Sequence, residues 1–535
     1  MFGSNTSLSS FIAPEDILSQ QRVARQLTDL FITKDFESVD IPTIVDTSLV
    51  EKANSKFSQN VFKLFDESGK TLALRTELTQ PLAKMVANYH SKLKLPQKYF
   101  YDASVFRFKG SQTDSSKEIK QVGVEVFGQE AGAIDKELIE LMLDSVDELK
   151  LANAKISITD TQIWKKIFEL YGSSELSFEE ELNKLMRTNA YKSILASDEK
   201  LSLAAKLYKT LLENNIVRFR ELVETKSELQ IFLTSTKVED FEALLKIDLT
   251  LLKETEALSE IVSFDPLQCP DLKLYTGLHF MLFAKGSGSM LALGGRYDGL
   301  CTQFGADIPA IGFAFYIKEL SGLVEDASLR TKLRIAIAKG GLFEKAKEFL
   351  TEKSFKFSEE KNRKLILEVD SDLNAPFKEV EILLVRGHDV PVYVEHGAAD
   401  LGIVGLDVEL DANTANVLVK DLGYGHCRLS VCAKEGLYKS VYDLPKQTRV
   451  ATTFPHLAKE FFDLKGINTE VINLYGSVEL GPLTDLSDVI VDLVATGKTL
   501  KENKLEEIES FLDCSAYLIA NKASFKLYSN ELLGF

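Results

Sequence analysis

The segment "VIVDLVATGKTL" (489–500) joins an apolar run to a small turn of threonine, glycine and lysine. The run 489–494 predicts a buried strand, and the charged residues that follow the turn predict a helix. The turn 496–499 can offer hydroxyl and backbone donors to a phosphate, and Asp492 can accept hydrogen bonds from sugar hydroxyls. A turn of this kind is more often only a loop, so the rest of the chain has to decide its role.

The composition is that of an ordinary globular protein with an acidic balance. The 535 residues are enough for two to four domains, 45% of them are hydrophobic, and the formal net charge is -17. A pI near 5.1 argues against broad nucleic-acid binding, which needs a basic surface. Anions must therefore bind in local pockets built from a few cations, backbone N–H groups and metal.

The cysteines and the termini favour a cytoplasmic protein. The five cysteines are odd in number and scattered, with no CxxC pair, which favours reduced thiols over a disulfide framework or a zinc site. No apolar run approaches a membrane span, and the Ser-rich start lacks the features of a secretory signal. We expect residues 1–11 to be disordered. The cysteines are Cys269, Cys301, Cys427, Cys432 and Cys514.

The N-terminal half has the pattern of an antiparallel sheet with helices between its strands. Helices are predicted at 14–35 and 134–150, and a helical insertion rich in Leu, Lys and Glu at about 160–262. A polar linker is predicted at 321–331. Strands are predicted at 61–65, 71–75, 98–108, 120–128, 273–285, 290–295 and 311–320.

The pattern after residue 331 changes to alternating strand and helix, which indicates an α/β domain with mainly parallel strands. It starts with a strand at 333–338 and a helix at 342–353. The segment "AKGGLFEK" (338–345) connects them, and its glycines and helix start could bind an anion. Such a segment is more often only a tight turn between a strand and a helix. The alternation continues through VEILLV (380–385), PVYVEHG (391–397), LGIVG (401–405), RLSVCA (428–433) and RVATTF (449–454).

Several segments of this half closely resemble the short form of ATP phosphoribosyltransferase, the first enzyme of histidine biosynthesis. They stand in the family's order over about 332–535, and the most specific are "VPVYVEHGAADLGIVG" and "YGSVELGPL" followed by "IVDLVATGKTL". The resemblance implies a two-lobed α/β fold like that of periplasmic binding proteins, with the active site in the cleft. We expect a catalytic domain at 326–535, with lobe 1 at about 332–424 and 508–535 and lobe 2 at about 425–507.

The implied reaction joins N1 of the adenine of ATP to C1 of phosphoribosyl pyrophosphate and releases pyrophosphate. Negative charge builds on the leaving group, so Mg²⁺ carried by the substrate phosphates and cationic side chains must stabilise it. The adenine nitrogen is already unprotonated near neutral pH, so no general base is needed. Positioning two anionic substrates is the larger task.

The resemblance also implies which residues bind. Phosphoribosyl pyrophosphate would contact Asp492, Ala495, Thr496, Gly497, Lys498, Thr499 and Glu479. ATP would contact Lys339, Gly340, Arg363 and Arg386, with Arg363 and Lys339 acting on the developing charge.

Other interpretations of these residues remain open. Arg363 could be a solvated surface charge, and Arg386 could form an ordering ion pair with Asp389. His396 favours a structural role at a helix end. Gly341 stands where the family commonly has arginine, so one cation is missing and the others carry more of the charge.

The N-terminal half resembles the catalytic core of histidyl-tRNA synthetase and its paralogue, the regulatory subunit of ATP phosphoribosyltransferase. The resemblance covers about 12–320 and is strongest at "GVEVFG" and "GGRYDGL". It implies a class II synthetase fold, usually dimeric, in a regulatory domain at 12–325.

The residues of that core match only in part. Arg107 fits the motif 2 arginine, and Glu77, Gln121, Glu125 and Tyr275 fit positions that contact histidine. The histidine-signature arginine falls at Pro270 and the motif 3 arginine at Glu319, where a carboxylate would repel ATP phosphates. Aminoacylation is therefore expected to be lost. The matching residues could form a histidine-sensing or purely scaffolding pocket, or Glu77, Gln121 and Glu125 could be merely a buried polar network.

The two resemblances together predict a natural fusion of the regulatory and catalytic subunits. We expect a homo-oligomer, a dimer or tetramer, with histidine as feedback inhibitor and with no nucleic-acid or membrane partner. An active histidyl-tRNA synthetase, a solute receptor and a scaffold with an inactive catalytic half are the alternatives.

Overall fold

The computed structural model divides the chain into two compact units, one from the described residues before 325 and one from those after 331. The structure describes residues 14–47, 49, 61–107, 117–170, 238–239, 247–265, 268, 274–324, 332–353, 355–357, 365–371, 379–495 and 497–533. The predicted disordered start, 1–11, and most of the predicted helical insertion lie outside these residues.

The N-terminal unit is built on a sheet that is mostly antiparallel, as the strand pattern predicts. The described part of this sheet has eight strands in the order β1-β5-β6-β11-β10-β9-β7-β8, with parallel pairs only at β1/β5 and β7/β8. A smaller antiparallel sheet has the order β2-β4-β3. The bounds are β1 (Glu37–Ser38), β2 (Ile44–Asp46), β3 (Lys63–Phe65), β4 (Thr71–Leu74), β5 (Gln97–Phe106), β6 (Glu118–Phe127), β7 (Ala154–Asp160), β8 (Val262–Phe264), β9 (Leu278–Ala284), β10 (Ala292–Arg296) and β11 (Ala310–Tyr316).

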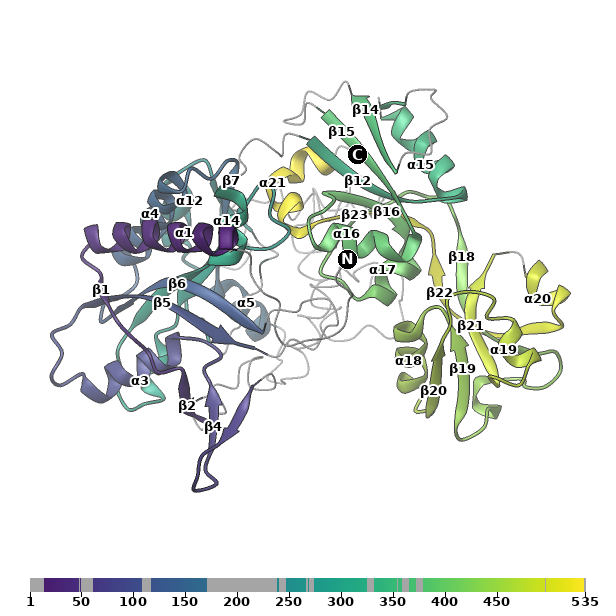
Figure 1. Ribbon diagram of the computed structural model, residues 1–535, viewed down its shortest axis with the longest axis horizontal. Helices are drawn as coiled ribbons and strands as arrows, with labels where there is room; N and C mark the ends of the chain where they lie inside the picture. Colours follow the sequence, from purple (N-terminus) through teal and green to yellow (C-terminus); the bar gives the residue numbers. More distant parts are fainter. Residues whose placement is uncertain are drawn as a thin grey trace. The chain divides into compact units, whose positions relative to one another are not determined.

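Helices cover both faces of the larger sheet, because alternate residues of its strands point to opposite sides. On one face Phe31 of α1 packs edge-on against Phe313 of β11. On the other face Leu82 and Val86 of α3 share a core with Tyr101 of β5. Figure 1 shows α1, α4 and α14 together on one side of the sheet and α3 on the other. The helices are α1 (Pro14–Thr33), α3 (Thr79–Tyr89), α4 (Ala133–Glu148), α5 (Thr161–Leu170), α12 (Thr250–Glu256), α13 (Gly299–Thr302) and α14 (Ile317–Val324).

Two predicted strands of this unit extend too far. The strand predicted at 311–320 ends at Tyr316, and the helix α14 begins at Ile317. Ile317 and Leu320, three residues apart on one face of this helix, are both buried in the core. The strand predicted at 273–285 begins only at Leu278. Thr276, just before it, has no regular structure, although its N–H donates to the Arg296 carbonyl at 2.7 Å.

The C-terminal unit contains two sheets, which we call the first sheet and the second sheet. The first has, among the described residues, seven strands in the order β13-β14-β15-β12-β16-β23-β17. Its inner strands β15, β12 and β16 are parallel to one another. The strands are β12 (Lys332–Ala338), β13 (Phe355–Lys356), β14 (Ile366–Ser371), β15 (Glu379–Val385), β16 (Leu401–Gly405), β17 (Val417–Asp421) and β23 (Ala516–Ala520).

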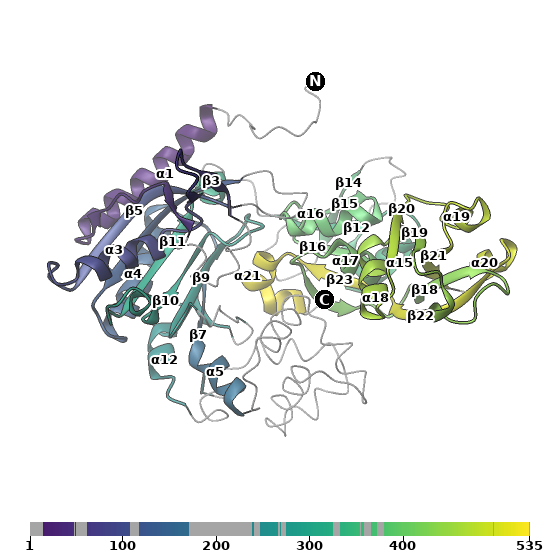
Figure 2. The same cartoon turned by 90° about the horizontal axis from the view of Figure 1, so that it is seen from below.

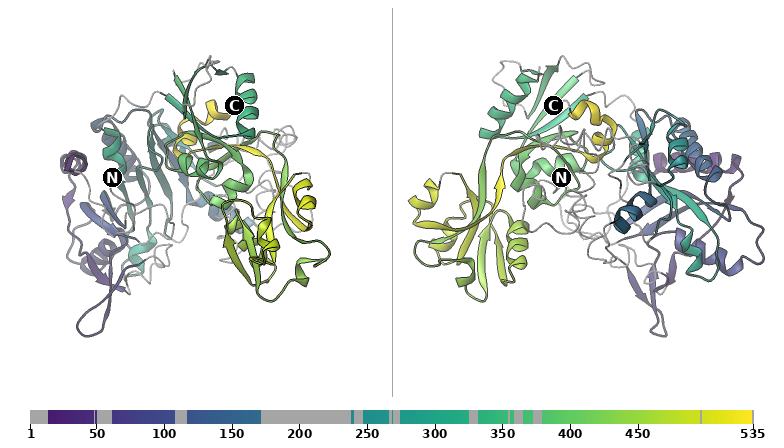
Figure 3. Two further views of the ribbon diagram at one scale, coloured as in Figure 1. Left: turned by 45° about the vertical axis from the view of Figure 1, so that its right-hand side comes forward. Right: turned by 180° about the vertical axis from the view of Figure 1, so that it is seen from behind.

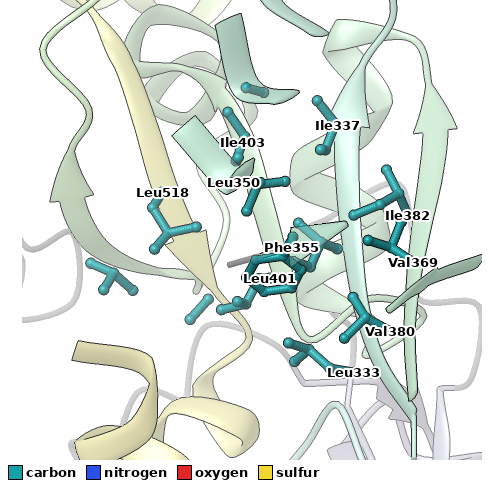
Figure 4. Close-up of a cluster of buried hydrophobic side chains, with 14 of the residues drawn as sticks. Leu333, Ile337, Leu350, Phe355, Val369, Val380, Ile382, Leu401, Ile403 and Leu518 are labelled. Carbon is teal, nitrogen blue, oxygen red and sulfur yellow. The ribbon is translucent and has the colours of Figure 1, made fainter. Parts of the chain in front are cut away.

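The first sheet is buried on both faces, which explains why β12 is apolar at five of its seven positions. Ile335 and Ile337 pack under α15 (Gly341–Glu352) and α21 (Lys522–Leu533), as the cluster in Figure 4 shows for Ile337 and Leu350. Ala336 and Ala338 pack on the other side against α16 (Val390–Glu395). A short 3-10 helix, η1 (Gly387–Asp389), precedes α16, and α17 (Leu406–Ala412) follows β16.

The segment PVYVEHG lies mainly in the helix α16, whereas the other four segments that continue the alternation lie mainly in strands. Close packing of this helix requires Gly402 in β16. A Cβ at Gly402 would lie 2.8 Å from side-chain carbons of Val390 and Val394. The glycine therefore lets α16 approach the sheet directly.

The second sheet has, in the described part, five strands in the order β20-β19-β21-β18-β22, and β19, β20 and β21 are mutually parallel. Residues 422–426 lead from β17 to β18, and Ser515 alone leads from β22 back to β23. Figures 2 and 3 show its green and yellow strands as a group apart from the first sheet. Its elements are β18 (Cys427–Lys434), η2 (Val441–Asp443), β19 (Thr448–Thr452), α18 (Pro455–Leu464), β20 (Thr469–Asn473), α19 (Leu480–Leu483), β21 (Val489–Val494), α20 (Lys498–Glu502) and β22 (Leu505–Cys514).

Within the described ranges, none of the helices combines the length and the apolar character that a bilayer crossing needs.

Candidate functional site

The parallel strands of the second sheet bring two predicted binding segments to one edge. Ligands of open α/β sheets bind beyond the carboxyl ends of the strands. Glu479 follows β20, and Ala495 and Gly497 follow β21, so they lie at the same edge. Thr496 lies outside the described residues, as does the side chain of Lys498.

Asp492 lies near the end of β21, opposite Ser430 of β18. Its Oδ1 accepts a hydrogen bond from the N–H of Leu493 at 2.8 Å. Burial raises the pKa of Asp492 to about 6, and the negative charge of Glu479 adds to the rise. The two carboxylates are therefore close enough to repel each other, which makes them a candidate site for hydroxyl groups or a cation.

The turn after β21 depends on Gly497, whose φ of 72° lies in the left-handed region that favours glycine. Gly497 is the N-cap of α20, and Thr499 is exposed within that helix. Ala495 is exposed as well. The turn therefore presents small residues to solvent, beside the two carboxylates.

The parallel strands of the first sheet bring a second set of predicted residues together. The N–H of Lys339 donates to the carbonyl of Val385 at 3.0 Å, which places Lys339 and Gly340 beside Arg386. Both cations are exposed. Within the described residues Arg386 forms no ion pair with Asp389, whose N–H donates instead to the Arg386 carbonyl at 3.0 Å. Arg363 lies outside the described residues.

The strand-end edges of the two sheets are joined by contacts that the sequence patterns did not reveal. The ring of His388, in η1, lies 5.9 Å from the ring of Phe454, centroid to centroid. Asp411 of α17 accepts hydrogen bonds from the N–H groups of His456 and Leu457, at 2.9 and 3.0 Å. No local residue caps α18, so its cap comes from the other sheet's helix.

His396 is the C-cap residue of α16, and its Nδ1 lies 3.0 Å from the carbonyl oxygen of Val392. The position agrees with the predicted structural role at a helix end.

A buried carboxyl network occupies the N-terminal unit. Glu125 of β6 is 1% exposed, and its carboxylate accepts hydrogen bonds from the hydroxyls of Tyr297 and of Thr79, the latter at 2.8 Å. Burial raises the pKa of Glu125 to about 8 against the effect of these bonds. The patterns predicted Glu125 but missed Thr79, Tyr297 and Tyr101. Burial also raises the pKa of Tyr101.

Glycines on the neighbouring strands make room for this network. A Cβ at Gly312 of β11 would overlap the Glu125 carboxylate and the Val124 carbonyl. A Cβ at Gly295 would lie 2.8 Å from a ring carbon of Tyr275. Gly123, Gly295 and Gly312, in "GVE", "LGGR" and "IGF", were therefore the sequence signal that bulky side chains approach the backbone on this face of the sheet.

The other predicted pocket residues lie around the same face. Glu77 is half-buried and caps α3, since its carboxylate accepts from the N–H of Gln80 at 3.0 Å, and burial raises its pKa to about 7. Arg107 donates from Nε to the Thr76 carbonyl at 2.8 Å, and Gln121 is buried in β6. The ring of Tyr275 packs edge-on against His279 with centroids 4.5 Å apart.

Of Glu319 and Pro270, the two positions where the synthetase has an arginine, the structure describes only Glu319. Glu319 lies in the first turn of α14, and one of its carboxylate oxygens is buried with no hydrogen-bond partner in the described part of the chain. This environment offers no compensation for a second anion such as a phosphate. Pro270 lies outside the described residues.

Comparison with known proteins identifies both halves. The family model described as histidyl-tRNA synthetase matches residues 9–320, more than half of the chain, and the model described as ATP phosphoribosyltransferase matches residues 386–533. An ATP phosphoribosyltransferase of Acaryochloris marina is 44% identical over 204 residues, 37% of this chain and 91% of that protein. The chain belongs to both families.

A second relative, the ATP phosphoribosyltransferase of Halothermothrix orenii, is 51% identical over 151 residues, 28% of this chain and 68% of that protein. A solved ATP phosphoribosyl transferase (HisG:HisZ) complex from Thermotoga maritima is 31% identical over 38% of this chain and 94% of the matched chain, with a TM-score of 0.33. That score supports no argument from the fold. The predicted pairing of a synthetase-like half with an ATP phosphoribosyltransferase half is confirmed by the two family models.

The matched range of the phosphoribosyltransferase model contains Arg386, Glu479, Asp492 and the turn 495–499. It does not contain Lys339 or Arg363. The roles of all these residues stay predictions.

Proposed function

We propose that this chain is a self-contained ATP phosphoribosyltransferase, whose synthetase-like half regulates its catalytic half. It condenses ATP, through N1 of adenine, with phosphoribosyl pyrophosphate, and releases pyrophosphate in the first step of histidine biosynthesis. Family membership of the C-terminal half supports the reaction. The observation that carries the site is the contact between two strand-end edges, one with cations and one with carboxylates and a glycine turn.

The catalytic half, which we place at 326–535, is proposed to be two-lobed like a periplasmic binding protein. Two crossings between the sheets, at 422–426 and at Ser515, support this arrangement. The active site would lie between the edges that His388, Phe454 and Asp411 bring into contact. The regulatory half, 12–325, would keep the class II synthetase fold. The substrates are cytosolic, so we place the enzyme in the cytoplasm.

Phosphoribosyl pyrophosphate would bind at the second sheet. The turn 495–499 would hold its 5′-phosphate through backbone N–H groups and the Thr496 and Thr499 hydroxyls. Asp492 and Glu479 would accept hydrogen bonds from the ribose hydroxyls. These bonds need ionised carboxylates, so the pKa of about 6 at Asp492 sets the lower limit of the working pH range.

ATP and the departing pyrophosphate would lie against the first sheet, where Lys339 and Arg386 are adjacent and exposed. Gly340 leaves the start of α15 open, and Arg363 is proposed to join this group. Their role is electrostatic, because the charge that appears on pyrophosphate is stabilised by cations already in place. The adenine N1 lone pair is free at neutral pH, so the protein only has to position it.

Magnesium fits the residues present, although no group of three or more potential side-chain metal ligands occurs in the described ranges. Mg²⁺ prefers oxygen ligands and usually keeps phosphate oxygens and water. Burial is the main cause of the raised Asp492 pKa, and the smaller contribution from the negative charge of Glu479 supports the proposal that a cation could lie near these two carboxylates. When bound with the substrate phosphates, it would supply charge neutralisation for the leaving group.

The reaction is tested by mixing the full chain with ATP, phosphoribosyl pyrophosphate and Mg²⁺, and following product absorbance together with pyrophosphate release. We expect turnover that needs both substrates. A histidine-dependent exchange of pyrophosphate into ATP, without turnover, would instead identify an active synthetase. Absence of both activities would leave only a scaffold.

Histidine is proposed as the feedback inhibitor, bound by Glu77, Arg107, Gln121, Glu125 and Tyr275. Two half- to fully buried carboxyls with pKa values of about 7 and about 8 suit a cationic amine or imidazolium. A bound cation would favour ionised Glu125, so binding at pH 7 should release up to about one proton per site.

Calorimetry in two buffers of different ionisation enthalpy measures that release. Replacing Glu125 by Gln should remove the proton release and weaken histidine binding. Unchanged binding in both Glu77→Gln and Glu125→Gln would show that these carboxyls are only a buried network.

A further inference from the structure

Two cysteines that are far apart in sequence face each other in the second sheet. Cys427 is the first residue of β18 and Cys514 is the last residue of β22, and the two are direct partners in this antiparallel pair. Both are free thiols. The pattern of scattered cysteines predicted reduced thiols and gave no indication that two of them would meet.

The pairing register is compatible with a disulfide. Directly opposed residues in an antiparallel pair have Cα atoms about 4.5 or 5.5 Å apart, depending on the kind of pair. A disulfide accepts Cα separations of roughly 4.4–6.8 Å. Either kind of pair therefore lies inside the permitted range.

The two thiols are also chemically different. A hydrogen bond from the Cys514 thiol lowers the pKa of Cys427, whereas the same bond and burial raise the pKa of Cys514. Cys427 is half-buried, while Cys514 is 3% exposed. Cys427 is thus the thiol that an oxidant reaches and that reacts as thiolate, and Cys514 is the thiol that resolves the mixed disulfide.

The other described cysteines lack this arrangement. Cys432 faces Ile490 and Glu507 in the same sheet, and Cys301 lies in α13 of the N-terminal unit. Burial raises the pKa of each to about 12, which keeps them as unreactive thiols.

The pair lies where the chain crosses between the two sheets. Cys427 follows the crossing 422–426, and Cys514 precedes the crossing at Ser515. Any rotation of one sheet against the other must be taken up by these two short segments. Both cysteines lie in the second sheet, so a covalent link between them would fix the paired strand ends from which the two crossings leave.

We propose that Cys427 and Cys514 are a redox-sensitive pair, which a low-molecular-weight disulfide converts to a protein disulfide that restrains the ends of β18 and β22, from which both crossings to the first sheet leave. The Cys427 thiolate attacks one sulfur of the small disulfide and releases one small thiol. The Cys514 thiol then loses its proton, attacks the Cys427 sulfur and releases the second small thiol. One disulfide is reduced to two thiols and one protein disulfide forms, so electrons and protons balance.

The bond itself is tested on the folded full-length chain in buffers of oxidised and reduced glutathione. After acid quenching and alkylation of the remaining thiols, peptide mapping should find the 427–514 link under oxidising ratios and lose it after dithiothreitol. The link should persist in Cys432→Ser and be absent in Cys427→Ser. Free, alkylated Cys427 and Cys514 at every ratio would overturn the proposal, with no variant needed.

The restraint has a separate readout, which rests on the proposed function. Oxidation should change kcat of the phosphoribosyl transfer at least about twofold in the wild-type chain and in Cys432→Ser, with full recovery on reduction. In Cys427→Ser, kcat should not respond. A mapped 427–514 link with unchanged kcat would overturn the restraint, whereas a chain with no transferase activity at all would overturn the proposed function and leave the peptide map as the test of the pair.

Discussion

Asp492 has to satisfy two opposing requirements. Its pKa is raised from 3.8 to about 6 by burial and by Glu479, so the folded state binds a proton more tightly than the unfolded state does. The stability that this proton confers is present at low pH and is lost as pH rises from about 4 through about 6. At neutral pH the ionised form therefore costs stability and is retained for binding the substrate.

Replacing Asp492 by Asn should stabilise the protein and disable the enzyme. Removing the buried charge should raise the free energy of unfolding at pH 7.5 by roughly 1–3 kcal/mol. Loss of the anionic acceptor should lower kcat/KM for phosphoribosyl pyrophosphate at least about 100-fold. Thermal unfolding and steady-state rates measure the two effects.

The matched control is Asp513→Asn, because Asp513 is an exposed carboxylate in the same sheet. Asp513→Asn should change neither the free energy of unfolding nor kcat/KM for phosphoribosyl pyrophosphate appreciably. In the wild type kcat/KM should fall below about pH 6, as Asp492 takes up its proton. An Asp492→Asn variant that keeps the wild-type rate would remove this residue from the site.

Gly312 makes room for the Glu125 carboxylate, so Gly312→Ala should destabilise the N-terminal unit. The new methyl group would overlap a carboxylate and a backbone carbonyl, and overpacking of this kind costs about 1–3 kcal/mol. Gly322→Ala is the control, because its Cβ meets nothing within 4 Å and lies in a helix, where alanine is favoured. Equal thermal midpoints for both variants would contradict the overlap.

Individual residues of the site were predictable where the chemistry is carried by a short segment. Asp492 and Gly497 share one strand and turn, and their proximity to Glu479 follows once β20 and β21 are parallel. The partners of Glu125 were not predictable, because Thr79 comes from α3, Tyr101 from β5 and Tyr297 from the loop after β10. Such contacts depend on register and packing, which no local pattern encodes.

At the scale of elements, the start of α18 depends on a residue from another helix. Asp411 accepts from the N–H groups of His456 and Leu457, and its own pKa is raised by burial. Asp411→Ala should destabilise the C-terminal unit by about 1–2 kcal/mol through loss of a cap. Asp411→Asn keeps an acceptor oxygen and should recover most of that loss in thermal unfolding. Equal losses in the two variants would show that charge, not capping, matters.

The elements that the sequence predicted well are those whose burial is uniform. The apolar run of β12 correctly predicted an inner strand, because helices cover both faces of its sheet and select apolar residues there. PVYVEHG also begins with an apolar run but forms α16, since Pro391 in the first turn and the close approach at Gly402 suit a helix. A short apolar run does not distinguish these two cases, which packing decides.

At the scale of the whole molecule, joining a regulatory half to a catalytic half fixes their ratio and raises their effective concentration. Histidine bound in the N-terminal unit would then act on the catalytic half through a coupling free energy of about 1–3 kcal/mol, or about 5- to 150-fold in affinity.

A fragment of residues 326–535 should separate catalysis from regulation. An alignment to 37% of the chain covers 91% of the Acaryochloris marina ATP phosphoribosyltransferase, so a part of this chain matches nearly all of that protein. We expect the fragment to turn over substrates and to lose inhibition by histidine, measured as the concentration that halves the rate. Unchanged inhibition in the fragment would place the effector site in the catalytic half.

The placement of β23 has a consequence for biosynthesis on the ribosome. β23 lies between β16 and β17, so residues 516–520 fill an inner position of a sheet whose other strands were translated long before. Until those residues emerge, β16 and β17 each expose an unpaired apolar edge, the kind of edge that recruits other chains. The nascent protein should consequently need chaperone protection late in translation, and truncation ahead of Ala516 should yield insoluble product even though every proposed active-site residue has been made.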